Sequence, residues 1–167
     1  MARFVYRMQS VLNIKQKTEG QVKMEFAEAQ AELNRQNDIL NGYISDALTY
    51  LEGEGFHVRS DVSYGNSMIR IQRESVSRVF SNLLSNIMKY AKRDAEVLIS
   101  CRDKGGFVEV QFINAVRVFE EDKPESTGFG YRIITRLMSE MNGEYSTEEK
   151  GSYYISKLRF QKVPERR

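Results

Sequence analysis

The spacing of apolar residues changes near residue 53, and this change constrains the fold more than any other feature of the sequence. From Thr18 to Leu51, apolar side chains recur at three- and four-residue steps, which is the period of an amphipathic helix. After Gly53 and Gly55, short stretches with a period of two alternate with stretches of helical period. We therefore expect one long N-terminal helix, followed by a domain that mixes strands with helices.

The mixed domain is expected to contain two hairpins, two helices and a last strand. Turn residues mark several boundaries, as at Asp103-Lys104-Gly105-Gly106 and Asn142-Gly143. This order predicts an α+β fold, a two-layer sandwich of a mixed, mainly antiparallel sheet and helices. The expected elements are a hairpin over Phe56–Ile71, a helix over Ser75–Ala91, a hairpin made by Glu96–Arg102 and Phe107–Asn114, a helix from Gly130 to Met141, and a strand over Ser152–Phe160.

Composition excludes several classes of protein. Lys and Arg total 25 against 23 for Asp and Glu, and the signs alternate along the chain, so we expect no nucleic-acid partner. The single Cys101 excludes a disulfide or a cysteine metal site within one chain. No segment has the apolar run of a signal peptide or of a membrane-spanning helix, so we expect a cytoplasmic protein without a membrane segment.

Two asparagines lie four residues apart on the helix expected over Ser75–Ala91. Asn82 and Asn86 therefore project from one helix face, and Lys89 follows close by. Mg²⁺ prefers a few protein oxygens together with waters and phosphates, and a lysine attracts phosphates. Asparagines on a helix are also common as solvated polar residues, so the pair alone leaves both interpretations open.

A glycine turn, Gly128-Phe129-Gly130, opens the next expected helix. Glycine lets the backbone approach phosphate oxygens, and a helix N-terminus supplies N–H donors. A plain turn would need the same residues, but a polar loop before the turn and a helix after it are the context that a phosphate site requires.

Three motifs together resemble those of sensor histidine kinases. The segment Asn82–Ala91 resembles that family's N box. Ser126–Ile133, with Leu137-Met138 and Asn142-Gly143 after it, resembles the G2 box, and Gly151-Ser152 resembles the glycine–hydroxyl pair of the last strand. The similarity covers about Asp38 to Lys162. It implies a Bergerat-type ATP-binding catalytic domain that positions Mg-ATP for transfer to a histidine outside this chain.

The resemblance assigns roles residue by residue. It implies ATP and Mg²⁺ as cofactors, and a phospho-acceptor histidine domain and a response regulator as partners. Asn82 and Lys89 would be catalytic. The loop Ala115–Thr127 would be a mobile ATP lid. The implied ligand contacts are Asn86 to Mg²⁺, Asn82, Lys89 and Arg117 to phosphates, Tyr90, Asn114 and Ser152 around the base, and Gly128 and Gly130 at the phosphate turn.

Two positions depart from the family pattern. Asn114 stands where most members have an aspartate that accepts a hydrogen bond from the adenine amino group, so the site loses a charge there. The only histidine, His57, lies in a strand-like segment without the acidic neighbour that typically follows a phospho-acceptor. We therefore expect no acceptor histidine in this chain.

The first residues resemble a different family. The segment Phe4–Lys15, and the helix to about Gln36, are similar to the start of FliJ, the coiled-coil component of the flagellar export apparatus. A natural fusion or an engineered extension would both explain a junction near Asn37. The expected divisions are a helical segment 1–37, which could form a homodimer, an ATP-binding domain 38–162 and a disordered tail 163–167.

Three alternative functions compete with the kinase interpretation. ATPase relatives and serine kinases of the anti-sigma-factor type usually carry a glutamate where this chain has Asn82, and an amide is a poor base. A vestigial site in a protein-interaction module would explain Asn114. It would not explain why the lysine, both asparagines and both glycines are retained together.

Overall fold

The computed structural model describes residues 2–65, 67–118 and 128–163, with side chains from Lys15 onward except Leu33. Contacts divide the chain into two compact units, Met1–Arg35 and Gln36–Arg167. Helix α1, Ala2–Gly53, begins in the first unit and ends in the second, which confirms the long N-terminal helix. The expected tail lies almost entirely outside the described residues.

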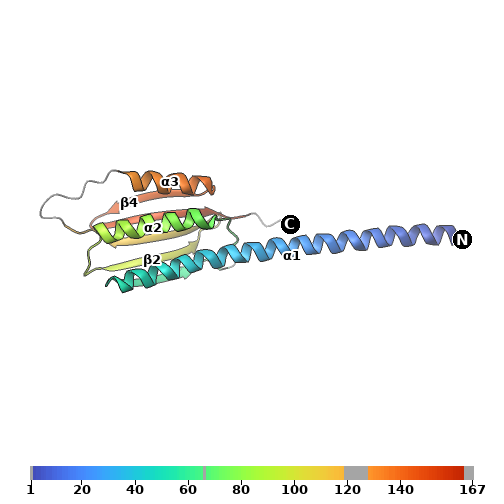
Figure 1. Ribbon diagram of the computed structural model, residues 1–167, viewed down its shortest axis with the longest axis horizontal. Helices are drawn as coiled ribbons and strands as arrows, with labels where there is room; N and C mark the ends of the chain where they lie inside the picture. The colour runs from blue at the N-terminus through green and yellow to red at the C-terminus, as the bar shows by residue number, and fades with distance from the viewer. Residues whose placement is uncertain (1, 66, 119–127, 164–167) are drawn as a thin grey trace. The chain divides into compact units, whose positions relative to one another are not determined.

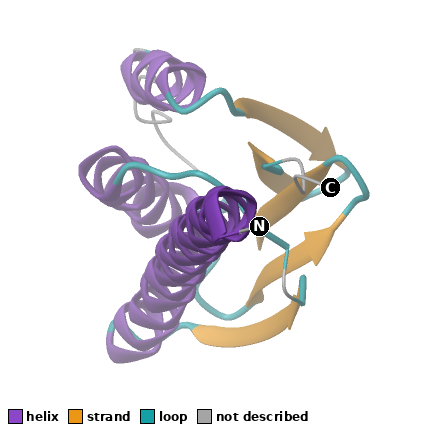
Figure 2. Ribbon diagram, turned by 90° about the vertical axis from the view of Figure 1, so that its right-hand side faces the viewer, coloured by secondary structure: helices purple, strands orange, loops and turns teal. Residues whose placement is uncertain are grey.

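The second unit is a two-layer α+β sandwich, as the sequence predicted. Helices α2 and α3 and the end of α1 cover one face of a five-stranded sheet (Figures 1 and 2). The strand order is β1-β2-β3-β5-β4, in which β1 and β2 are parallel and all other neighbours are antiparallel. The elements are α2 Arg73–Tyr90, α3 Phe129–Glu140, β1 His57–Ser63, β2 Glu96–Asp103, β3 Phe107–Ala115, β4 Glu144–Lys150 and β5 Tyr153–Gln161.

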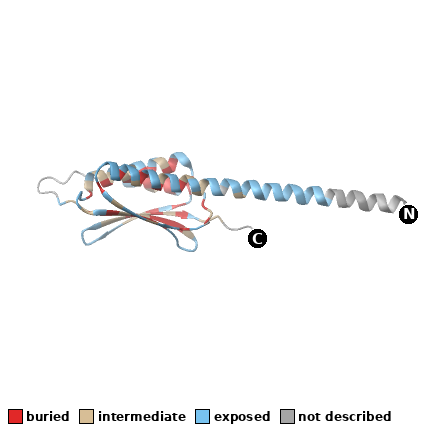
Figure 3. Cartoon of the chain, turned by 90° about the horizontal axis from the view of Figure 1, so that it is seen from below, coloured by how far each residue is buried: buried red, intermediate tan, exposed pale blue. Residues whose placement is uncertain are grey.

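The hydrophobic core lies between the helices and the sheet (Figure 3). Leu40 and Ile44 of α1 are buried in it, so the widened apolar stripe after Leu40 does mark a helix docked on a globular core. Phe80 of α2 meets Phe112 of β3 edge to face, with ring centroids 5.5 Å apart. Such pairs add about 1 kcal/mol beyond the area that they bury.

The predicted hairpin over Phe56–Ile71 is wrong. Strand β1 pairs in parallel with β2, and α2 forms the crossover between them. Residues 68–71 make only an isolated bridge, Ile69 with Lys162, among the described residues. The apolar spacing that suggested a second strand reflects burial, because Ile69 is fully buried and Ile71 nearly so.

Side chains of α1 satisfy the backbone of this buried segment in place of a neighbouring strand. Gln36 Oε1 accepts a hydrogen bond from the Ile71 N–H at 3.0 Å, and Asn37 Nδ2 donates to the Ser67 carbonyl at 2.9 Å. Buried backbone groups require such partners. The segment can therefore remain irregular inside the core.

Strand β4, Glu144–Lys150, was missed by sequence reasoning. Four of its seven residues are charged, and Tyr145 alone among them is buried. Charged side chains are typical of an edge strand, which packs only one face and exposes an unpaired edge. The other predicted helices and strands, from Ser75 to Phe160, are confirmed, and none of their ends differs from the prediction by more than two residues.

Among the described residues, no helix combines the length and apolar content needed to cross a membrane.

Gly143 follows α3 at a point where the backbone approaches β5 closely. A Cβ at this position would lie 2.5 Å from the Arg159 carbonyl oxygen and 2.9 Å from the Met138 methyl carbon. We expect Gly143→Ala to lower the free energy of unfolding by about 1–3 kcal/mol through overpacking. Urea denaturation measures this change. Gly106→Ala is the control, because a Cβ at that position would have no atom within 4 Å, and little change is expected.

Candidate active site

Helix α2 presents its two asparagines beside the start of α3. Val79, Leu83 and Ile87 are buried at four-residue steps and fix the rotation of the helix. Asn82 and Asn86 are half-buried at its edge. They share one face with each other, as predicted from their spacing.

A cavity of about 440 Å³ opens between this helix edge, the start of α3 and the sheet. It brings together residues from α2, β3, α3, β4 and β5. Ser152 and Arg117 are not among the residues that line it. The predicted site residues that do line it are Asn82, Asn86, Lys89, Tyr90, Asn114, Gly128 and Gly130.

Gly130 lies directly against both asparagines. A Cβ on Gly130 would lie 3.7 Å from Asn82 Oδ1 and 3.9 Å from both Nδ2 and Oδ1 of Asn86, which are ordinary van der Waals contacts. Because glycine has no side chain, it leaves both amide groups uncovered on this side.

The N-terminus of α3 faces this space without an acidic or capping side chain of its own. Gly128, the N-cap residue, has φ 64° and ψ 4°, a left-handed conformation that favours glycine. The first turn contains no Asp or Glu. Its N–H groups and the positive end of the helix dipole therefore favour an anion.

Asn82 is held by its own helix. Its Nδ2 donates to the Arg78 carbonyl at 2.8 Å. The amide oxygen is thereby left as an acceptor on the side where Gly130 lies. A fixed acceptor beside an anion-favouring helix N-terminus suits a ligand that carries both phosphate and a hydrated cation.

The sheet side of the cavity holds Asn114 at the end of β3. Asn114 is buried, and its Nδ2 donates to the neighbouring Ala115 carbonyl at 3.2 Å. Ser156 of β5 and Tyr145 of β4 lie on the same floor, with their hydroxyl oxygens 3.4 Å apart. Burial raises the pKa of Tyr145 to about 12.

The end of α2 is bonded to the segment that follows β3. The Lys92 N–H donates to the Ala115 carbonyl at 2.8 Å, and the Arg117 N–H donates to the Tyr90 carbonyl at 2.7 Å. Ala91 and Val116 form a bridge between these bonds. The first residues of the predicted lid are therefore fixed beside the cavity, and residues 119–127 lie outside the described residues.

Ser152 lies exposed in the turn between β4 and β5, where its carbonyl accepts a hydrogen bond from the Val116 N–H at 2.8 Å. Four residues later, Ser156 lines the cavity in its place. Sequence reasoning also missed Tyr145, Tyr154 and Glu149. The period of two on β5 offered a signal, because Tyr154 and Ser156 continue the buried face of Leu158 and Phe160.

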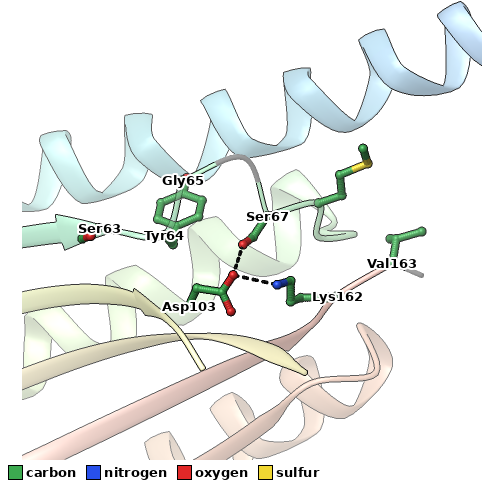
Figure 4. Close-up of a pocket in the computed structure, with 8 residues that line it drawn as sticks. Ser63, Tyr64, Gly65, Ser67, Asp103, Lys162 and Val163 are labelled. Atoms are coloured by element: carbon green, nitrogen blue, oxygen red, sulfur yellow. Dashed lines mark hydrogen bonds and ion pairs between the residues drawn. The ribbon is translucent and has the colours of Figure 1, made fainter. Parts of the chain in front are cut away.

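A second pocket, of about 480 Å³, lies at the opposite end of the strands (Figure 4). Asp103 is its centre and accepts hydrogen bonds from Lys162 Nζ at 2.6 Å, from Ser67 Oγ and from the Gly105 N–H at 2.7 Å. These bonds, led by that of Lys162, lower the pKa of Asp103 to about 2. Because Asp103, Lys162 and Ser67 are bonded to one another, they connect the ends of β2 and β5 to the loop after β1.

Comparisons with known proteins agree with the fold. No protein-family model matches the chain. The sensor histidine kinase YrkQ of Bacillus subtilis (strain 168) is 32% identical over 133 residues, which are 80% of this chain and 31% of YrkQ. The chain thus spans less than a third of the length of that relative.

Solved structures share the fold at lower identity. The catalytic domain of histidine kinase ThkA matches with a TM-score of 0.63 and 18% identity over 75% of this chain and 95% of that domain. The histidine kinase domain of the E. coli osmosensor EnvZ gives 0.54 and 17%, covering 77% and 88% of the two chains. Full-length ShkA, solved with AMPPNP, gives 0.57 and 17%, covering 75% and 30%.

This chain has the fold of a histidine kinase catalytic domain. The cavity lies where the two segments that resemble the N box and the G2 box meet. His57 lies exposed at the start of β1, outside the residues that line the cavity.

The buried phenol of Tyr145 makes the stability of the histidine kinase fold sensitive to high pH. A raised folded-state pKa means that the stabilisation is complete below the unfolded value, about 10, and is lost as pH rises through about 12. We expect Tyr145→Phe to reduce the fall in unfolding free energy across this window. Urea denaturation at several pH values measures it. Tyr50→Phe, on an exposed tyrosine, is the control, and an equal fall in both variants would contradict the assignment.

Proposed function

We propose that this chain is the ATP-binding catalytic domain of a two-component sensor histidine kinase, a protein-histidine kinase that lacks its own phospho-acceptor. The observation that carries the proposal is the meeting of Asn82, Asn86 and Lys89 with the Gly128–Gly130 turn at one cavity. Its volume, about 440 Å³, lies within the range of small-molecule sites. The homology with YrkQ and the nucleotide analogue in the ShkA structure support the same function.

The phosphate end of the nucleotide is proposed to lie between α2 and α3. Lys89, in the last turn of α2, supplies an exposed ammonium, and the α3 N-terminus supplies N–H donors. Asn82 contributes an amide oxygen held in place by its bond to Arg78. These groups would orient the terminal phosphate, and orientation is most of what a protein contributes to phosphoryl transfer.

Asn86 is proposed as the protein ligand of Mg²⁺. Its amide group lies beside Gly130, and the described residues contain no group of three or more His, Cys, Asp or Glu that could hold a metal. A single amide ligand fits Mg²⁺, which keeps several waters and takes its other ligands from phosphates. When bound, the ion neutralises charge on the phosphate oxygens.

The base is proposed to occupy the sheet side of the cavity. Asn114 and Tyr90 line it there, and Ser156 takes the place predicted for Ser152. Arg117 remains a proposed phosphate contact from the segment after β3, although it is not among the described residues that line the cavity.

The acceptor of the phosphoryl group is proposed to be a histidine on a separate helical domain, from which a response regulator receives it. His57 is the only histidine, and it lies on a strand outside the cavity.

The first unit is proposed as a pairing segment, since Val22 and Phe26 on its helix are largely exposed and could meet a second copy.

We expect Asn86→Ala to weaken Mg²⁺-dependent binding of a non-hydrolysable ATP analogue by roughly tenfold or more, the loss expected for a metal ligand or its support. The free energy of unfolding should change by less than about 1 kcal/mol, because the side chain is not in the core. Calorimetric titration measures the affinity. Ser81→Ala, on the exposed face of the same helix, should leave it unchanged. Unchanged affinity in Asn86→Ala would falsify the metal assignment.

We expect no self-labelling when the chain is incubated with γ-labelled ATP, because no described nucleophilic histidine reaches the cavity. A separately supplied phospho-acceptor histidine domain should become labelled, and the label should be removed by acid. Acid-labile label on the isolated chain that disappears in His57→Gln would overturn the acceptor assignment. Acid-stable label on a partner would move the chain to the serine-kinase class.

A further inference from the structure

We propose that the nucleotide cavity accepts 6-oxopurine nucleotides as well as adenine nucleotides, because the neutral amide of Asn114 faces the base. This inference rests on the proposed nucleotide site and concerns its selectivity. Adenine carries an amino donor at position 6 and an acceptor at N1, whereas a 6-oxopurine carries an acceptor and a donor at the same places. An asparagine amide offers one acceptor and a donor group, so it can complement either pattern.

A single long hydrogen bond holds the Asn114 amide in its orientation. Its Nδ2 donates to the Ala115 carbonyl at 3.2 Å, the long end of the normal range. The same carbonyl already accepts the Lys92 N–H at 2.8 Å. Rotating the amide gives up this long hydrogen bond and brings Asn114 Oδ1 toward the Ala115 carbonyl, which keeps its shorter hydrogen bond from Lys92. In exchange, the rotated amide turns its donor group toward a 6-oxo oxygen.

The neighbouring hydroxyls can also serve either as donors or as acceptors. Tyr145 and Ser156 lie with their oxygens 3.4 Å apart, and either can donate to the other. Tyr154 pairs with Asn114 across β3 and β5 and adds a third hydroxyl to the cavity lining. Hydroxyls that both donate and accept do not select one base over another.

No fixed charge beside Asn114 opposes a 6-oxo oxygen within the described lining of the cavity. Its two charged side chains, Lys89 and Glu149, are exposed. Lys89 belongs to the last turn of α2, and Glu149 pairs with Tyr154, so it lies two strands away from Asn114. A carboxylate at position 114 would instead repel the 6-oxo oxygen, because it can only accept hydrogen bonds.

The experiment compares ATP with inosine triphosphate, which replaces the 6-amino group by an oxo group. Calorimetric titration with Mg²⁺ should give dissociation constants within about tenfold of each other for the unmodified chain, since the difference is about one neutral hydrogen bond. Asn114→Asp should shift the ratio roughly ten- to hundredfold toward ATP. Asn34→Asp adds the same charge on the exposed face of α1 and should leave the ratio unchanged.

Each outcome bears on the proposal. The proposal would be overturned if the unmodified chain bound ATP strongly and preferred it over inosine triphosphate by more than about a hundredfold, well beyond the effect of one hydrogen bond. That result would leave the proposed function intact. A ratio that does not move in a folded Asn114→Asp variant would also overturn it. If that variant does not fold, the ratio in the unmodified chain decides alone. Failure of both nucleotides to bind the unmodified chain would reject the proposed function itself.

Discussion

Docking of helix α2 on the sheet is the contact on which the site depends. Val79, Leu83 and Ile87 are buried at four-residue steps, and this stripe fixes the rotation of the helix. Asn82 and Asn86 each precede a stripe residue by one position, so they come to lie at the helix edge beside the cavity. A shift of the stripe by one residue would turn both amides away from Gly130. The apolar core and the polar site are therefore set by the same helix.

Local patterns in the sequence were sufficient for the helices and for the β2–β3 hairpin, because their signals lie within one segment. The parallel pairing of β1 with β2 could not be predicted in this way, since it joins segments separated by the whole of α2. The apolar residues at 68–71 suggested a strand because burial alone produces the same pattern. Strand β4 was missed because an edge strand with one buried tyrosine has almost no apolar period.

The candidate site shows the same difference between signals within one segment and contacts between distant segments. Its α2 and α3 residues could be predicted, because the asparagine spacing and the glycine turn are contiguous motifs. The period of two on β5 indicates which of its residues share a face, but it could not predict the sheet floor, because Tyr145 and Ser156 meet only through the register of β4 and β5. The motif-based choice of Ser152 lies in the turn before β5, and the residue that lines the cavity lies within that strand. Register sets which hydroxyl faces the cavity, and it is a property of the folded sheet.

The central claim is that the cavity binds nucleotide together with Mg²⁺. Thermal unfolding of the unmodified chain, with a non-hydrolysable ATP analogue in the presence of either Mg²⁺ or a chelator, tests it most directly. A ligand at about 100 times its dissociation constant adds about 2.7 kcal/mol to the stability of the folded state. The account predicts a clear rise in Tm with analogue and Mg²⁺ together, and a much smaller one with the chelator. An unchanged Tm at saturating analogue and Mg²⁺ would contradict it.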